Sequence, residues 1–268
     1  MSININSKLV SFAQNELVLG YSDKERERIN VSIEQIKKVL KNKLGEEIRE
    51  ILLFGSYTRN TIIPRKYDRK SDIDLMIIFN IKDTVKKPAR YRMKLKLACA
   101  QAYQKSFYSV DSPAVKLLLN HIKFDLVPAY TEDFPYTPGK YYYIPDKYEE
   151  WQSTEPNDIN PRLSSLNQEY GNNVIRNVLR LCKHWNASAG YPLESYTMEK
   201  QIIEQAYWFK EDTYNRFLIT INNIAGTMPK VKLALSQIER YKDDMFRNPD
   251  EQKQFNWLCR LLPGLRNK

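Results

Sequence analysis

Two aspartates one residue apart, Asp72 and Asp74, open the apolar run DIDLMIIF. Side chains two positions apart on a β-strand project to the same face, so both carboxylates are expected to point the same way. Like charges this close repel each other unless a cation lies between them, and carboxylate oxygens are ligands that suit Mg²⁺. The pair therefore predicts a metal site, although a D-x-D tripeptide alone can simply mark the solvated end of a strand.

A third carboxylate, Asp125, lies inside a second apolar run, IKFDLVPAY. A charged side chain within an apolar strand is costly unless it has a partner. Three carboxylates on two strands supply what a two-metal phosphoryl transfer requires. The alternative interpretation is that Asp125 faces the surface and alternates with Lys123.

A Gly-Ser pair, Gly55 and Ser56, follows the strand-like run EIREILLF. Glycine lets the backbone approach a ligand closely, and residues 56–61 are expected to open a helix whose N-terminal amide groups face an anion. The Ser56 hydroxyl would then meet the β- or γ-phosphate of a nucleotide. A Gly-Ser pair alone is weak evidence, but its place before D-x-D, between two strand-like runs, indicates a phosphate-binding turn.

The elements that must position these residues fall into two halves. Apolar residues between 29 and 44 recur at steps of three and four, which predicts a long amphipathic helix ending at Gly45. A helix is expected from Pro88 to about residue 107, and the runs AVKLLL and IKFDLVPAY are expected to be strands joined by a turn at Asn120 and His121. These elements predict a mixed α/β half that extends to residue 150.

The second half, residues 151–268, is expected to be all-helical. Residues 130–151 are rich in Pro, Tyr and Thr and are interpreted as a loop or linker. Helical patterns follow it at about 158–188, 195–210, 212–225, 230–245 and 250–262. The fold class is therefore α+β, with a ligand cleft expected between the two halves.

Composition narrows the class of protein. The 268 residues carry 42 Lys and Arg against 32 Asp and Glu, a net charge of +10, which favours an anionic partner such as nucleotide phosphates or nucleic acid. The three cysteines are far apart and form no C-x-x-C pair, which argues against a disulfide framework or a zinc site. The sequence shows neither a signal peptide nor an apolar run of about 20 residues, so a cytoplasmic protein without a membrane span is expected.

Together, the motifs FGSYTRNT, SDIDLMIIF and IKFDLVPAY resemble the polymerase β-like nucleotidyltransferase superfamily. They are most similar to bacterial cyclic-oligonucleotide synthases of the SMODS type, the CD-NTases of anti-phage CBASS operons. The segment NVLRLCKHWNASAGYPLESYTMEKQI also looks like the helical half of that family. The resemblance implies a nucleotidyltransferase core with a mixed sheet and flanking helices over residues 1–150, followed by a helical domain.

The resemblance also implies roles for the acidic residues and the Gly-Ser pair. Asp72 and Asp74 would hold two Mg²⁺ ions, with Mn²⁺ as an alternative. Asp125 would complete the shell of the catalytic metal and help to deprotonate the acceptor hydroxyl. Gly55 and Ser56 would hold the triphosphate of the donor nucleotide.

Three further residues match the helical half of the family. Lys183 corresponds to a lysine that reaches the triphosphate, although a solvated helix lysine is the simpler alternative. Ser195 corresponds to a phosphate-contacting serine and could equally be a helix N-cap. Tyr196 corresponds to an aromatic residue that stacks on the donor base, and a place in the core is its alternative.

The implied activity is a Mg²⁺-dependent synthase that joins nucleoside triphosphates, ATP with GTP or UTP as further candidates, into a cyclic di- or trinucleotide for anti-phage defence. Pyrophosphate would be released, and CBASS accessory or effector proteins are the candidate partners. The alternative keeps the fold but adds nucleotides to RNA or AMP to a protein, which the positive charge would suit. A third hypothesis, a nucleotide- or RNA-binding module without catalysis, fits poorly with three retained carboxylates.

Overall fold

The chain forms two compact units in the computed structural model, which describes residues 3–19, 24–104, 106–111, 113–133, 140–205, 211–242 and 249–267. The sheet unit consists of residues 20–59 and 71–158. The helical unit consists of residues 1–19, 60–70 and 159–268. The helical unit thus gathers three separate stretches of the chain, whereas the expected division at residue 150 followed the sequence order.

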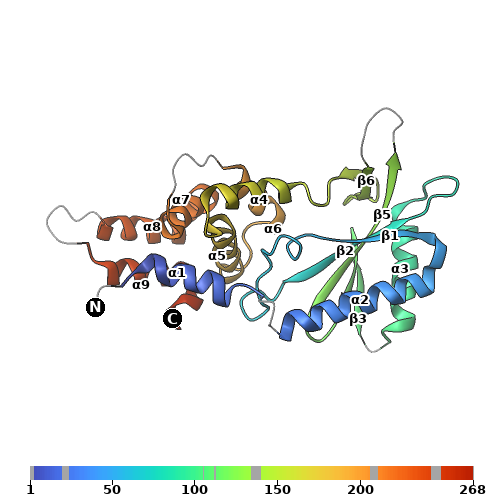
Figure 1. Cartoon of the computed structure of the whole chain (residues 1–268), viewed down its shortest axis with the longest axis horizontal. Coiled ribbons are helices and arrows are strands. Elements are labelled where there is room, and N and C mark those ends of the chain that lie inside the picture. The colour runs from blue at the N-terminus through green and yellow to red at the C-terminus, as the bar shows by residue number, and fades with distance from the viewer. Residues whose placement is uncertain are drawn as a thin grey trace. The chain divides into compact units, whose positions relative to one another are not determined.

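A mixed sheet organises the sheet unit (Figure 1). Its strands are β1 (Ile48–Phe54), β2 (Asp72–Phe79), β3 (Phe107–Asp111), β4 (Ala114–Leu118), β5 (Lys123–Asp133), β6 (Lys140–Pro145) and β7 (Trp151–Thr154). The order is β1-β2-β5-β4-β3, with β6 paired to β5 and β7 paired to β6. β2 and β5 run parallel and the other pairs are antiparallel. The predicted α+β class, with a mixed sheet and flanking helices, is confirmed.

Two helices, α2 (Lys24–Leu44) and α3 (Pro88–Ala102), contact each other and the sheet (Figure 1). The apolar face predicted for α2 is buried, and the helix ends before Gly45, whose φ is +51°. α3 begins at Pro88 as expected, but the prediction that it reaches residue 107 was wrong. Residues 107–111 instead pair with β4, because cross-strand hydrogen bonding outweighs the local helical pattern.

The interpretation of residues 130–151 as a loop was also wrong. β5 continues to Asp133, and β6 and β7 extend the sheet from it; residues 134–139 lie outside the described part. The rings of Tyr130 and Tyr143 stack across the β5–β6 pair with centroids 4.8 Å apart, and Trp151 packs edge-on against Tyr130. Aromatic cross-strand pairs stabilise sheets, so the tyrosine-rich composition marked strands.

The helical unit contains helix α1 (Ile5–Ser11), a π-helical turn (Phe12–Glu16) and a group of helices from residue 159 onward. These are α4 (Ile159–Tyr170), α5 (Val174–Ser188), α6 (Ser195–Glu204), α7 (Thr213–Ala225), α8 (Pro229–Lys242) and α9 (Glu251–Leu261), followed by a 3₁₀ segment (Pro263–Asn267). The single helix expected at 158–188 is divided into α4 and α5. Gly171, Asn172 and Asn173 adopt φ values of +70°, +47° and +54°, which no α-helix accommodates. The expected ends of two other helices, at 206–210 and 243–245, lie outside the described residues.

A core of apolar side chains from both ends of the chain holds the helical unit together. Leu9 and Phe12 from the N-terminal stretch are buried with Leu181 of α5, Phe217 of α7 and Leu258 of α9. This shared core explains why residues 1–19 belong to the helical unit.

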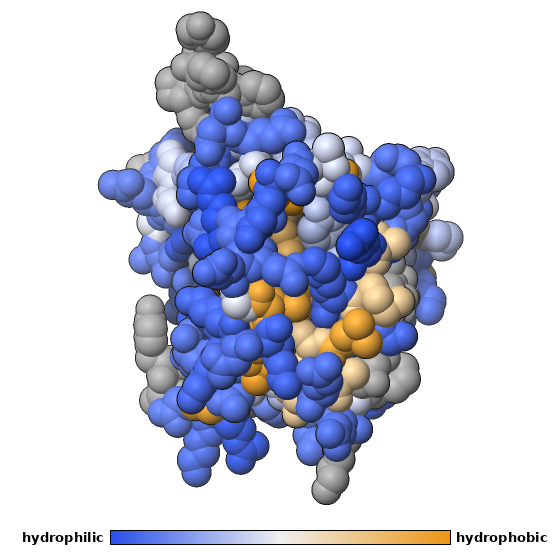
Figure 2. All heavy atoms as spheres, turned by 90° about the vertical axis from the view of Figure 1, so that its right-hand side faces the viewer, coloured by the Kyte–Doolittle hydropathy of each residue, from blue (hydrophilic) through white to orange (hydrophobic). Residues whose placement is uncertain are grey.

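The surface view in Figure 2 is mostly hydrophilic, with smaller hydrophobic areas between the polar side chains. None of the helices that the structure describes is both long enough and apolar enough to cross a membrane.

Candidate active site

The pairing of β2 with β5 brings the predicted carboxylates together. In this parallel register Asp72 lies opposite Lys123, and Asp74 lies opposite Asp125. The intervening residues Ile73 and Phe124 are fully buried, whereas the four polar residues are only partly buried. Because alternate residues of a strand share a face, Asp72, Asp74, Lys123 and Asp125 form one polar patch on one face of the sheet. We call these four residues the carboxylate patch.

Within the carboxylate patch, Lys123 forms ion pairs with two of the three carboxylates. The Lys123 Nζ lies 2.7 Å from Asp72 Oδ2 and 3.3 Å from Asp125 Oδ1. Lys123 therefore pairs with carboxylates from both strands. Asp125 does alternate with Lys123 on one face of β5, but its side chain is only 19% exposed and lies against Lys123 and not free in solvent.

Burial raises the pKa of the Asp125 carboxyl above its ordinary value, and the nearby charge of Asp72 raises it further. The ammonium groups of Lys123 and Lys116 oppose this rise without cancelling it. For the Lys123 ammonium, burial alone would lower the pKa, but Asp72 and Asp125 together raise it. The site thus concentrates negative charge that a cation must balance.

The backbone of Gly55 packs directly against the side chain of Asp74. Its φ of +77° lies in the left-handed region that favours glycine, and a Cβ atom at this position would overlap Asp74 Oδ2. Gly55 thus approaches a carboxylate of the patch closely, whereas the approach to a phosphate that the Gly-Ser pair predicted stays a prediction. Only glycine suits this position, because the backbone conformation is left-handed and the Asp74 carboxylate leaves no room for a side chain.

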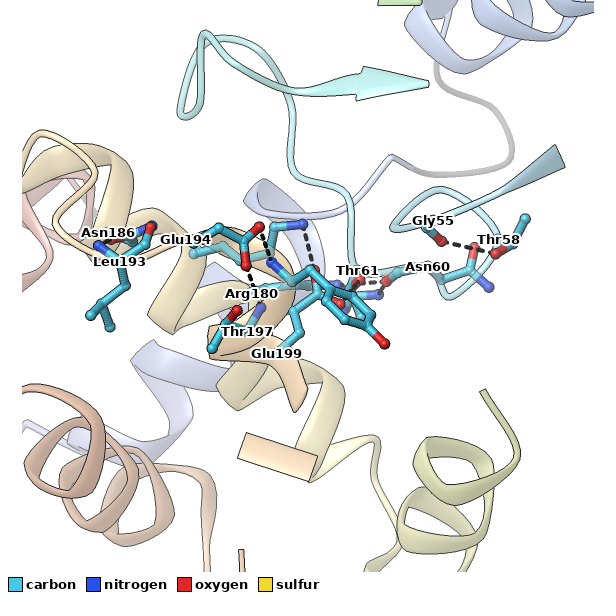
Figure 3. Close-up of polar contacts among 12 residues, drawn as sticks. Gly55, Thr58, Asn60, Thr61, Arg180, Asn186, Leu193, Glu194, Thr197 and Glu199 are labelled. Carbon is cyan, nitrogen blue, oxygen red and sulfur yellow. Dashed lines mark hydrogen bonds and ion pairs between the residues drawn. The ribbon is translucent and has the colours of Figure 1, made fainter. Parts of the chain in front are cut away.

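The segment after Gly55 forms a series of turns, so the expected helix at residues 56–61 was wrong. The Thr58 hydroxyl donates a 2.8 Å hydrogen bond to the Gly55 carbonyl oxygen (Figure 3). Thr58 also lies 3.3 Å from Asn157 Oδ1, within the same unit. Local side-chain hydrogen bonding of this kind competes with helix formation and fixes the turn instead. Ser56 lies in this turn, and its phosphate contact stays a prediction.

The three carboxylates of the patch are the predicted ligands of the metal. Among the residues that the structure describes, no three His, Cys, Asp or Glu side chains are arranged to hold one metal ion. The donor set nevertheless suits a hard cation, because three carboxylates share one face, and the described residues offer the buried Asp125 Oδ1 no hydrogen-bond partner beyond the Lys123 ammonium. The residues fit a divalent cation, provided that Lys123 gives up its present pairing.

Lys183 lies in the helical unit, buried on α5. Its Nζ pairs with Glu199 Oε1 at 2.9 Å, and the side chains are only 7% and 1% exposed. The Thr61 hydroxyl donates to Glu199 Oε2 at 3.2 Å (Figure 3). The alternative of a solvated lysine was wrong, and contact with a phosphate stays a prediction.

Ser195 and Tyr196 begin α6, where both are exposed. The N-cap is Glu194, whose carboxylate accepts hydrogen bonds from the backbone N–H groups of Tyr196 and Thr197 (Figure 3). Ser195 is therefore the first helical residue and not the cap. Tyr196 is 44% exposed, so the alternative of a core residue was wrong and base stacking stays a prediction.

Sequence reasoning named Lys123 only as a surface neighbour of Asp125, and it missed Glu199. Lys123 precedes Asp125 by two positions, and this spacing on a strand could have placed it in the carboxylate patch. Glu199 gave no comparable signal, since its partners Lys183 and Thr61 come from different segments of the chain.

The comparisons with known proteins agree with this architecture. The family model of the Second Messenger Oligonucleotide or Dinucleotide Synthetase domain, SMODS, matches residues 1–167. A "probable cyclic nucleotide synthase" of Bacillus cereus (strain VD146) is 28% identical over 248 residues, spanning 76% of this chain and 72% of that protein.

Solved structures show the same fold at low sequence identity. The CD-NTase CdnG of Bradyrhizobium diazoefficiens, in complex with GTP, is 12% identical with a TM-score of 0.63, and the match covers 98% of this chain and 90% of that one. Escherichia coli CdnC, in its complex with HORMA-deltaN, is 11% identical with a TM-score of 0.66 and 97% of each chain covered. With most of its length matched by the family model, the chain belongs to the SMODS family of nucleotidyltransferases that synthesise second messenger oligonucleotides or dinucleotides.

Proposed function

We propose that this protein is a Mg²⁺-dependent nucleotidyltransferase that joins nucleoside triphosphates into a cyclic di- or trinucleotide and releases pyrophosphate. The observation that carries the proposal is the β2–β5 register, which gathers Asp72, Asp74 and Asp125 on one face of the sheet. ATP is the first candidate substrate, with GTP and UTP as further candidates. Solved relatives of the same fold in complexes with GTP and with ATP support nucleotide substrates.

Asp72, Asp74 and Asp125 would hold the metal, with two Mg²⁺ ions as the expected complement and Mn²⁺ as an alternative. When bound, such ions neutralise a triphosphate and favour in-line attack of a hydroxyl on the α-phosphorus. Asp125 would also help to deprotonate the acceptor hydroxyl, as a carboxylate that lies beside the other two on one face of the sheet can do.

Gly55 and Ser56 would hold the donor triphosphate, on the turn that Thr58 fixes. Lys183 and Ser195 would contribute phosphate contacts, and the exposed ring of Tyr196 would stack on the donor base. For Lys183 this role requires exchange of Glu199 for a phosphate, because the ammonium is now paired with that carboxylate.

The biological setting proposed is cytoplasmic anti-phage defence, with CBASS accessory or effector proteins as partners. Support comes from the resemblance of the sequence motifs to the CD-NTases of CBASS operons. The three free thiols of Cys99, Cys182 and Cys259 suit a reducing compartment.

The test is to incubate the purified protein with all four NTPs and Mg²⁺, then treat with phosphatase and identify resistant species by mass. Phosphatase removes terminal phosphates but leaves a closed phosphodiester ring. We expect a resistant product that Asp125→Asn reduces by at least about 10²-fold, because a metal ligand and proton acceptor is lost. Asp133→Asn is the matched control: it lies on the same strand, but its carboxylate is 62% exposed and paired with Arg49.

Two outcomes would contradict the proposal. Full activity of Asp125→Asn would exclude the carboxylate patch as the catalytic centre. A phosphatase-sensitive product that grows on added RNA, or AMP attached to protein, would replace the cyclic product with the polymer or protein acceptor. The net charge of +10 favours the RNA acceptor among these alternatives.

A further inference from the structure

Lys123 lies where a cation is needed between two strands. Its ammonium is 2.7 Å from a carboxylate oxygen of Asp72 on β2 and 3.3 Å from one of Asp125 on β5. The three side chains are 23%, 28% and 19% exposed, so water reaches each of them in part. One positive charge therefore lies between two carboxylates that would otherwise repel each other.

The backbone makes this arrangement a property of the fold. Lys123 is the register partner of Asp72, and Asp125 follows it two positions along β5 on the same face. Asp125 Oδ1 is also buried, and beyond the Lys123 ammonium at 3.3 Å it has no hydrogen-bond partner among the described residues, so this ion pair leaves the oxygen incompletely satisfied. The oxygen remains available for a stronger ligand.

We propose that Lys123 is an internal counter-ion that holds Asp72 and Asp125 together in the metal-free protein and must leave them when a divalent cation binds. The inference rests on the proposed function, since it takes these carboxylates to be metal ligands. A lysine suits the task because its ammonium is a point charge on a flexible four-carbon stem, and its partial exposure gives it a way out into solvent. Lys123 thereby lowers the affinity of the nucleotide-free protein for metal.

The test measures binding of Mn²⁺ to the nucleotide-free protein by electron paramagnetic resonance, with no turnover involved. Lys123→Met is expected to bind Mn²⁺ about tenfold more tightly than the wild type, because no ion pair then competes for the carboxylates. In EDTA, Lys123→Met should have a lower melting temperature than the wild type, because the carboxylates then repel each other without a counter-ion. Saturating Mn²⁺ should raise the melting temperature of Lys123→Met by more than it raises that of the wild type.

Three control variants separate the ion pair from simple loss of charge. Lys140→Met removes a lysine that pairs with Glu50 elsewhere on the same unit and should bind Mn²⁺ like the wild type. Lys116→Met removes a charge from the register partner of Asp125 on β4 and should change affinity less than Lys123→Met. Lys123→Arg keeps the charge and should bind Mn²⁺ no more tightly than the wild type. Lys123→Gln replaces Lys123→Met if the latter fails to fold by circular dichroism.

The outcomes distinguish this inference from the proposed function. If the wild type binds Mn²⁺ and Lys123→Met binds it equally, the counter-ion role is overturned while the metal site stands. The counter-ion role is likewise overturned if Lys116→Met tightens binding as much as Lys123→Met. If neither the wild type nor Lys123→Met binds Mn²⁺, the metal site itself is overturned, and both proposals are lost.

Discussion

Each unit contains a lysine paired with carboxylates, but the two lysines differ in how far water reaches them. In the sheet unit, Lys123 and Asp72 are 23% and 28% exposed. In the helical unit, Lys183 and Glu199 are 7% and 1% exposed. The partial exposure of the first pair suits the proposed exchange of Lys123 for a metal ion, because the charges remain partly hydrated throughout.

The buried pair behaves differently because the loss of either partner leaves a charge in a poorly hydrated interior. Glu199 also accepts a hydrogen bond from Thr61, which ties residues 60–70 to α6 within the helical unit. Arg180 strengthens the same attachment by donating to the Asn60 carbonyl oxygen at 2.8 Å (Figure 3). The Lys183 pair therefore contributes to the stability of the fold, and the proposed exchange of Glu199 for a phosphate would cost more free energy than the proposed exchange of Lys123 for a metal ion.

The largest expected effect is the loss of the buried carboxylate. Glu199→Ala should lower the free energy of unfolding by about 3–5 kcal/mol, since Lys183 is left buried without its counter-charge. Urea denaturation followed by circular dichroism measures the change. Asp72→Ala, which breaks the part-exposed pair, should lower it by no more than about 1 kcal/mol.

A double variant, Lys183→Met with Glu199→Leu, should recover most of the stability that Glu199→Ala loses, because apolar side chains need no counter-charge. Equal losses from Glu199→Ala and Asp72→Ala would remove the distinction between the two pairs.

A pH dependence follows from His184, which neighbours Lys183 on α5. Burial lowers the pKa of His184 to about 4 from its ordinary 6.5, so the fold favours the neutral ring. As pH falls from about 6.5 to about 4, the unfolded chain takes up a proton that the folded protein does not, and up to about 3 kcal/mol of stability is lost. Urea titrations at several pH values measure this loss.

The control is His184→Phe, which cannot titrate at this position. The difference in unfolding free energy between wild type and His184→Phe should be constant above pH 7 and shift against the wild type below it. A difference that stays constant down to pH 4.5 would contradict the burial of a neutral histidine.

An intermediate effect is expected at Gly55. Gly55→Ala should cost about 1–3 kcal/mol because of its positive φ, and it should also reduce product formation, because the new Cβ displaces the Asp74 carboxylate. Gly45→Ala is matched for strain, with φ of +51°, but its Cβ would meet no atom within 4 Å. Gly45→Ala should therefore lose stability and keep activity; equal activity of the two variants would count against the fit between Gly55 and Asp74.

The smallest effect on stability is expected at Tyr196. Because this side chain is 44% exposed, Tyr196→Ala should change the free energy of unfolding by less than about 0.5 kcal/mol. If the ring stacks on the donor base, KM for that nucleotide should rise about tenfold. Tyr148→Ala, at a 72% exposed position of the sheet unit, is the control and should change neither quantity. An unchanged KM for Tyr196→Ala would contradict the proposal that Tyr196 stacks on the donor base.

Local sequence patterns predicted several elements of the fold correctly. The three- and four-residue spacing of apolar residues determined α2, and Gly45 marked its end. The hairpin turn at Asn120 and His121 is confirmed by the hydrogen bond from the Leu119 N–H to the Ile122 carbonyl oxygen. In each case the governing interaction joins residues close together in the chain, so it is visible in the sequence.

The incorrect predictions arose where distant partners decided the local structure. Residues 107–111 became a strand through pairing with β4, and the stretch interpreted as a loop supplied β6 and β7 through pairing that begins at β5. The division of the chain had the same origin, because residues 1–19 share a core with helices far along the sequence. Strand pairing and core packing depend on contacts between residues far apart in the sequence, and a local sequence pattern does not show such contacts.

The sequence by itself determined that Asp72 and Asp74 share a face, because a strand alternates with period two whatever it pairs with. Only the tertiary structure decided that Asp125 lies beside Asp74 and Lys123 beside Asp72, because the register of two parallel strands depends on the packing of the whole sheet. It alone also decided that Lys183 is buried against Glu199. Spacing along one element follows from backbone geometry, whereas pairing between elements follows from how apolar surfaces are buried together.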